Sequence, residues 1–310
     1  MLNYTIKRLL YGCLTVFFII TATFFAMHSI PGDPLLGEKK MDEQTRKNLE
    51  EKYGLDKSLG AQYLIFLKNL AQGDLGISFT QKNRSINDII KGHFPVSAKL
   101  GVMALFFAAI GGIVFGAITA VYRNKWPDVV IVFFVILSIS VPSFVFAALA
   151  QLVMVSLNKS LEWSLTFAKP QGFIELIIPA LILGLGTMAF LTRLMRSSML
   201  EVVNTDYIRT AKAKGISPIQ IFFKHQLRNA ILPVITVLGP SIASITVGSF
   251  VVESVFAIDG LGTYFVNGVQ QNDYTLIMGT TVFYGSFLVL MVLVVDLIYG
   301  FIDPRIQVEK

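Results

Sequence analysis

The sequence contains few charged residues, and this shortage decides the class of protein. Charged side chains make up 15% of its 310 residues and hydrophobic ones 54%, whereas soluble domains carry about 25% charged residues. The shortage is concentrated in long uncharged runs, each able to cross a hydrocarbon core of about 30 Å as a helix. Lipid offers the backbone no hydrogen-bond partners, and the runs are longer than the strands of membrane barrels. We therefore predict transmembrane helices.

Cysteine and histidine are scarce as well. The single cysteine, Cys13, lies in an apolar run and has no partner for an intramolecular disulfide, so cysteine use says nothing about the redox compartment. The three histidines, at positions 28, 93 and 225, are far apart and no cysteine cluster accompanies them. We therefore predict no metal site in this chain.

Six apolar segments are predicted to span the membrane, which makes the fold an all-α membrane protein. They cover residues 9–30, 98–121, 129–157, 173–192, 230–252 and 276–298. The first follows Lys7 and Arg8 as a signal peptide would, but it is longer than a signal sequence's apolar core and no small-residue cleavage site follows. An uncleaved span is therefore favoured. Pro142 is expected to kink the third span.

The spans divide the chain into four parts. These are a first transmembrane helix (1–30), an extracytoplasmic region (31–96), a five-span core (97–302) containing a cytoplasmic loop (193–230), and a cytoplasmic tail (303–310). Two short surface helices are expected in the second part, at 41–53 and 61–71. Lysine and arginine concentrate in the short segments on the side of the N-terminus, so the positive-inside rule predicts that both termini are cytoplasmic. The net charge of +6 then reflects topology rather than nucleic-acid binding.

The loop at 193–230 is the most informative segment. It is rich in helix-forming residues and is interrupted at Gly215, which suits a helix C-terminus. Asn204 and Thr205 are candidate N-caps for the helix before that glycine. A short cytoplasmic helix of this kind is suited to receive a push from a partner protein. An ordinary basic loop bound to anionic lipid has the same composition.

The sequence from Tyr207 to Gly215 resembles the cytoplasmic loop of ATP-binding-cassette importer permeases. It is similar to the oligopeptide, dipeptide and nickel branch, and especially to the oligopeptide permease B type. The similarity covers essentially the whole chain through motifs at 29–34, 73–78, 223–233, 252–256, 260–262, 272–274 and 296–305. Two departures stand out. The general importer loop begins Glu-Ala-Ala, which is Arg209 to Ala211 here, a degenerate form typical of the peptide branch. Asp259 replaces a common proline.

The resemblance implies the type I importer permease fold and a set of partners. These are a sister permease, two ATP-binding-cassette ATPase subunits, an extracytoplasmic binding protein and a peptide substrate. The chain has no Gly-x-x-x-x-Gly-Lys-Ser/Thr loop to cradle phosphates. It is therefore expected to be a transport subunit that is not itself an enzyme and binds no cofactor, while the ATPase subunits bind ATP and Mg.

Two groups of candidate site residues follow from the resemblance. The ATPase-coupling group is Tyr207, Arg209, Thr210, Ala211, Lys214 and Gly215, with the small side chains of Thr210 and Ala211 at the closest contact. The candidates for the translocation path are Ser138, Ser140, Ser143, Gln151, Ser241, Ser244, Thr246, Ser249 and Glu253. Hydrogen bonding between or within helices is the alternative role for the second group.

Three other functions compete with peptide import. The same architecture could carry nickel chelates or another small solute. A secondary transporter would usually place ionisable residues inside its spans as ion relays, and these spans hold almost none away from their ends. An intramembrane enzyme would need a catalytic pattern such as Gly-x-Ser-x-Gly or His-Glu-x-x-His, and neither is present.

Overall fold

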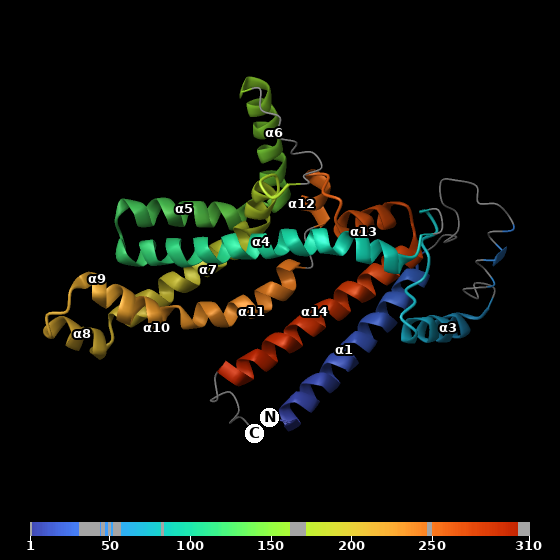
Figure 1. The fold of residues 1–310 in the computed structure, drawn as a ribbon, viewed down its shortest axis with the longest axis horizontal. Helices are drawn as coiled ribbons and strands as arrows, with labels where there is room; N and C mark the ends of the chain where they lie inside the picture. Colours follow the sequence, from blue (N-terminus) through green and yellow to red (C-terminus); the bar gives the residue numbers. More distant parts are fainter. Residues whose placement is uncertain are drawn as a thin grey trace. The chain divides into compact units, whose positions relative to one another are not determined.

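The fold is that of a helical membrane protein, as the composition predicts (Figure 1). The structure is a computed structural model. It describes residues 2–30, 57–81, 84–161, 172–246 and 250–302, together with 44, 47, 48 and 51. Within these residues the extended structure is limited to one isolated bridge between Ile77 and Ser85. The predicted helix at 41–53 and the tail at 303–310 lie largely or wholly outside the described residues.

Five of the described helices are long and apolar enough to cross a membrane. They are α1 (Leu2–His28), α4 (Ile86–Val121), α6 (Ser143–Leu161), α7 (Ile177–Val203) and α14 (Tyr274–Ile302). Two shorter apolar helices accompany them, α5 (Trp126–Ser140) and α11 (Leu232–Thr246). The other helices are α3 (Leu59–Ala71), α8 (Asp206–Ala213), α9 (Pro218–Ile221), α10 (Arg228–Ala230), α12 (Phe250–Val255) and α13 (Leu261–Gln270), with a π-helical turn, η1 (Phe222–Leu227).

Two predicted spans are wrong as single helices. The segment 129–157 forms α5 and α6, because the chain becomes extended at Val141 and Pro142 has no N–H to continue the ladder of α5. A kink was expected, and a complete break is found. The segment 230–252 is divided among α10, α11 and α12, although Pro240 is accommodated inside α11.

Helix α7 also differs from its predicted bounds. It begins at Ile177 rather than at 173 and continues to Val203, eleven residues beyond the predicted end of the span. The extension carries polar residues that the hydropathy pattern assigned to a loop. Its side chains at Met195, Ser198 and Met199 are buried, which explains why packing keeps this polar stretch helical.

The chain forms two compact units, one of residues 1–97 with 259–297 and the other of residues 98–258 with 298–310. In the first unit, Phe24 and Met27 of α1 pack with Tyr274, Ile277 and Met278 of α14.

A buried carboxylate, Asp273, organises the loops of this first unit. One of its oxygens accepts hydrogen bonds from Ser78 Oγ (2.5 Å) and from both the N–H (3.1 Å) and the hydroxyl (2.9 Å) of Thr80. The other oxygen accepts from the N–H of Leu276 in the first turn of α14 (3.0 Å). The motifs at 73–78 and 272–274 thereby meet around one side chain.

Helix α13 receives its cap from a distant residue. The residue before it is glycine, which has no side chain to cap the helix, and the buried Ser97 Oγ instead accepts from Leu261 N (2.9 Å). Asp259, the residue that departs from the family's proline, lies beside this turn. His93 Nδ1 is 3.2 Å from both its carboxylate and its main-chain oxygen.

We expect Ser97→Ala to destabilise this first unit by about 1–3 kcal/mol, because it leaves the buried Leu261 N–H without its acceptor. The thermal midpoint of the detergent-solubilised protein measures the loss. Ser29→Ala is the matched control, since the Ser29 hydroxyl is exposed and donates to the Phe25 carbonyl one turn earlier in the chain. Equal midpoints for the two variants would contradict a capping role for Ser97.

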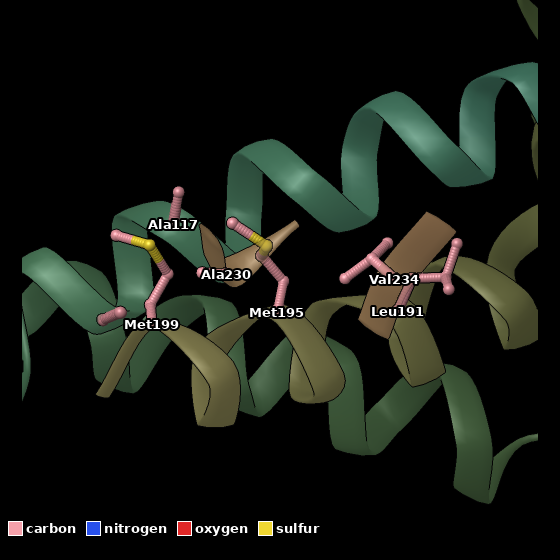
Figure 2. Close-up of a cluster of buried hydrophobic side chains, with 7 residues drawn as sticks. Ala117, Leu191, Met195, Met199, Ala230 and Val234 are labelled. Carbon is pink, nitrogen blue, oxygen red and sulfur yellow. The ribbon is translucent and has the colours of Figure 1, made fainter. Parts of the chain in front are cut away.

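In the second unit, α4 and α7 approach to backbone contact. A Cβ added to Gly116 would lie 2.5 Å from Met195 Cβ and 2.7 Å from the Thr192 carbonyl oxygen, and one added to Gly184 would lie 2.6 Å from the Ala104 carbonyl oxygen. Small residues allow such close approach where lipid provides no hydrophobic drive for association. Figure 2 shows Leu191, Met195 and Met199 of α7 in the adjoining cluster with Ala117, Ala230 and Val234. Ala120 belongs to the same cluster.

Candidate functional site

The segment after α7 folds into a short helical hairpin made of α8 and α9 (Figure 1). Thr205 has extended backbone angles and occupies the N-cap position of α8, as expected. Its hydroxyl donates back to the Val202 carbonyl (2.6 Å) and does not cap α8. Asn204 instead ends α7, where its side-chain amide donates to the Leu200 carbonyl (3.0 Å).

Gly215 makes the turn that reverses the chain after α8. Its φ is +73°, and the N–H groups of Gly215 and Ile216 donate to the carbonyls of Lys212 (3.0 Å) and Ala211 (3.3 Å). Only glycine adopts this left-handed conformation without a steric cost. A Cβ placed there would meet nothing within 4 Å. The requirement for glycine therefore comes from backbone conformation and not from crowding.

The second arm of the hairpin begins with a conventional cap and then changes its winding. Ser217 Oγ accepts from Gln220 N (3.4 Å), and Pro218 occupies the first turn of α9. The chain then passes through the π-helical turn η1 before α10. Such turns are uncommon and occur frequently at functional sites. The sequence predicted a second helix here but gave no sign of the π turn.

A small apolar core holds α8 against α9. Ile208, Ala211 and Ile221 are buried together, with Val202 and Ile216 packed against them. Ala211 therefore contacts this chain's own α9. Thr210 and Ala211 were both expected at the closest contact with the ATPase. Their side chains differ in exposure, since Ala211 is buried in this core and Thr210 is exposed.

The opposite face of α8 is exposed and mainly basic. Its candidate coupling residues Tyr207, Arg209 and Thr210 are exposed, and so is Lys214 directly after the helix. The Tyr207 hydroxyl accepts from Asn229 Nδ2 (3.1 Å), which restrains the aromatic side chain although 43% of it is accessible. The pair between Arg209 and Asp206 (3.2 Å) is fully at the surface and contributes little to stability. Helix α8 is therefore a short helix that packs on α9 through one face and exposes polar side chains on the other.

Comparison with known proteins identifies the family of the chain that contains α8. The model for the "binding-protein-dependent transport system inner membrane component" matches residues 112–308, and the corresponding N-terminal model matches residues 1–101. The chain belongs to this family. The resemblance found in the sequence is confirmed.

Relatives match this membrane component over its full length. It is 46% identical to the dipeptide transport system permease protein DppB of Bacillus subtilis, covering 100% of this chain and 99% of the relative. It is 41% identical to the oligopeptide transport system permease protein OppB of Haemophilus influenzae, and 37% identical to OppB of Salmonella typhimurium. Each of these two alignments covers 99% of this chain and 100% of the relative.

The candidate path residues of the membrane component fall into two groups. The hydroxyls of Ser138, Ser241 and Ser244 donate to carbonyls of their own helices at 2.8, 2.9 and 3.2 Å. These bonds agree with the alternative role of satisfying polar groups inside helices. The side chain of Thr246 and all of Ser249 lie outside the described residues.

The remaining path candidates lie on α5, α6 and α12. Ser140 and Ser143 flank the break between α5 and α6 and are exposed, Gln151 on α6 is half-buried, and Glu253 on α12 is buried. Helix α12 packs against α6, so the element carrying Glu253 adjoins the one carrying Ser143 and Gln151. This is the part of the second unit where polar candidates from separate segments lie on neighbouring helices.

Proposed function

We propose that the chain is the permease subunit of an ATP-driven peptide importer. Its relatives with full-length similarity are named as dipeptide and oligopeptide permeases, and these names support a peptide as the substrate. A sister permease completes the translocation path, two ATPase subunits bind ATP and Mg, and an extracytoplasmic binding protein delivers the peptide. Both termini face the cytoplasm, and the chain itself catalyses no reaction.

The observation that carries this proposal is the two-sided construction of α8. Its inner face is fixed by Ile208 and Ala211, and its outer face exposes Tyr207, Arg209 and Lys214. A helix held in this way transmits a force applied to its outer face instead of rotating under it. In the proposed cycle, ATP closes the ATPase dimer, α8 follows the ATPase surface, and the population shifts to an outward-facing permease.

Transport by the reconstituted complex tests the proposal. The chain is purified with its sister permease, ATPases and binding protein and placed in liposomes, and uptake of a radiolabelled dipeptide and pentapeptide is followed. Uptake of at least one peptide is expected to require internal ATP. Omitting the binding protein and supplying a non-hydrolysable ATP analogue are the controls.

Two outcomes would contradict the proposal in different ways. Uptake that follows a proton gradient and ignores ATP would replace it with a secondary transporter. ATP-dependent uptake of a nickel–histidine chelate without either peptide would keep the architecture and the ATPase coupling but change the substrate class.

A further inference from the structure

A partly buried ion pair joins α5 to α7 in the second unit. Arg196 Nε donates to Asp128 Oδ1 (3.1 Å) and Arg196 Nη2 donates to Asp128 Oδ2 (2.8 Å). The Asp128 side chain is 6% exposed and that of Arg196 is 30% exposed. Two parallel charge-assisted bonds fix both the distance and the orientation of the two groups.

The same carboxylate also fixes the turn between α4 and α5. Asp128 lies in the first turn of α5, and its Oδ2 accepts from the N–H of Asn124 (2.9 Å). Asn124 has a left-handed backbone, with φ of 61°. Asp128 therefore ties three elements together: the end of α4, the start of α5, and α7.

The position of Arg196 on α7 gives the pair a mechanical consequence. The preceding residue, Met195, packs against Gly116 of α4, while Arg196 contacts α5, so consecutive residues hold two different helices. Helix α7 continues to Val203, and α8 begins at Asp206. A displacement of α8 would thus move α7, which is held to α4 by side-chain packing and to α5 by the ion pair.

Stability alone is a weak explanation for such a pair. The desolvation of two charges offsets much of their attraction, and apolar side chains of similar volume often stabilise a protein equally well. The two parallel bonds supply something that apolar packing supplies poorly, which is a single fixed geometry between α5 and α7. Helix α5 ends at the break before Pro142, which is flanked by the path candidates Ser140 and Ser143.

We propose that Asp128 and Arg196 are positioning residues that pass the movement of α8 to α5. This inference rests on the proposed function, because the movement originates in the ATPase. With the pair intact, α5 and the end of α7 move together when ATP binds. Without it, α7 moves and α5 lags, so ATP is hydrolysed while less peptide crosses the membrane.

The experiment compares Arg196→Gln with the wild type in the complete reconstituted complex. Peptide imported per ATP hydrolysed is expected to fall at least fivefold in Arg196→Gln, while ATP hydrolysis stimulated by the binding protein stays within twofold of wild type. Arg196→Lys keeps the charge but loses the two parallel bonds. Its ratio of imported peptide to hydrolysed ATP should lie between those of the wild type and Arg196→Gln. Arg193→Gln is the matched control, since Arg193 is exposed one turn earlier on the same helix, and its ratio should equal that of the wild type.

A distance measurement gives a readout that a purely structural role would not change. Spin labels are attached at Trp126→Cys on α5 and Glu201→Cys on α7, both exposed positions, in a Cys13→Ser background because Cys13 is itself exposed. The distance between labels should be the same without nucleotide and with trapped ATP in the wild type. In Arg196→Gln it should change when ATP is trapped.

The outcomes separate this inference from the proposed function. If the wild type shows no ATP-dependent uptake, the proposed function itself fails. If the wild type is active and Arg196→Gln keeps both the wild-type uptake ratio and a constant label distance, the pair has no coupling role. If Arg196→Gln does not assemble, Arg196→Lys decides, and a wild-type ratio in that variant would overturn the inference.

Discussion

Replacing Gly215 with tryptophan is expected to reduce peptide uptake by roughly tenfold or more while leaving the amount of membrane-inserted protein unchanged. The left-handed backbone at Gly215 costs an ordinary L-residue about 1–2 kcal/mol, so the turn relaxes and α8 loses its fixed direction. The bulky side chain adds an obstacle next to the exposed face of α8. Because the turn lies outside the apolar spans, insertion should not depend on it. Vesicle uptake and quantitative immunoblotting of the membrane fraction measure the two effects.

A graded series separates backbone strain from bulk. Asparagine tolerates the left-handed region better than other non-glycine residues, so Gly215→Asn should keep most of the uptake. The uptake of Gly215→Ala should lie between those of Gly215→Asn and Gly215→Trp. The open space around the position means that alanine meets no steric clash there. Wild-type uptake in the tryptophan variant would remove Gly215 from the coupling site, and equal loss in all three would indicate that any side chain obstructs the partner.

Replacing Gly116 with alanine is expected to destabilise the second unit by about 1–3 kcal/mol, the usual cost of overpacking a close contact. The added methyl group would overlap both Met195 Cβ and the Thr192 carbonyl, and neither is the flexible end of a side chain. Helices α4 and α7 must therefore separate. Gly116→Leu should prevent assembly with the sister permease. Thermal midpoints and the yield of intact complex on size-exclusion chromatography record the two effects.

Gly186 provides the matched control for Gly116. It lies on α7 in the same unit, and a Cβ added to it would meet nothing within 4 Å. Gly186→Ala should therefore leave the midpoint unchanged or raise it slightly, since alanine favours helix over glycine. A similar loss in both variants would show that the midpoint responds to glycine replacement in general and not to the contact between α4 and α7.

Hydropathy and turn chemistry account for what the sequence predicted well. Long apolar runs located α1, α14 and the second part of α4, which begins twelve residues before the predicted span. The glycine at 215 marked the turn after α8, because both signals are local in the chain. The same local reasoning overestimated the continuity of 129–157, since hydropathy does not register the loss of a hydrogen bond at Pro142. It also ended α7 too early, because packing around Met199 keeps a polar stretch helical.

Long-range pairing was beyond the sequence alone. The motifs at 73–78 and 272–274 were both recognised, yet nothing in either indicates that Ser78 bonds to Asp273. Asp128 and Arg196 are 68 positions apart, and each resembles an ordinary charge at the end of a span. Such pairs depend on how helices pack, which the period of one helix does not specify. Covariation between these positions in related sequences is the signal that could have revealed them.

The small core of Ile208, Ala211 and Ile221 has an evolutionary consequence. It separates the residues of α8 that pack within this chain from the exposed ones, which meet the ATPase under the proposed function. In a lineage whose ATPase changes, Tyr207, Arg209 and Lys214 can drift with the new surface while Ile208 and Ala211 stay constant. Exchange of ATPases between related transporters would then require a few substitutions on the exposed side of α8. A permease could associate with a different ATPase while its fold stays the same.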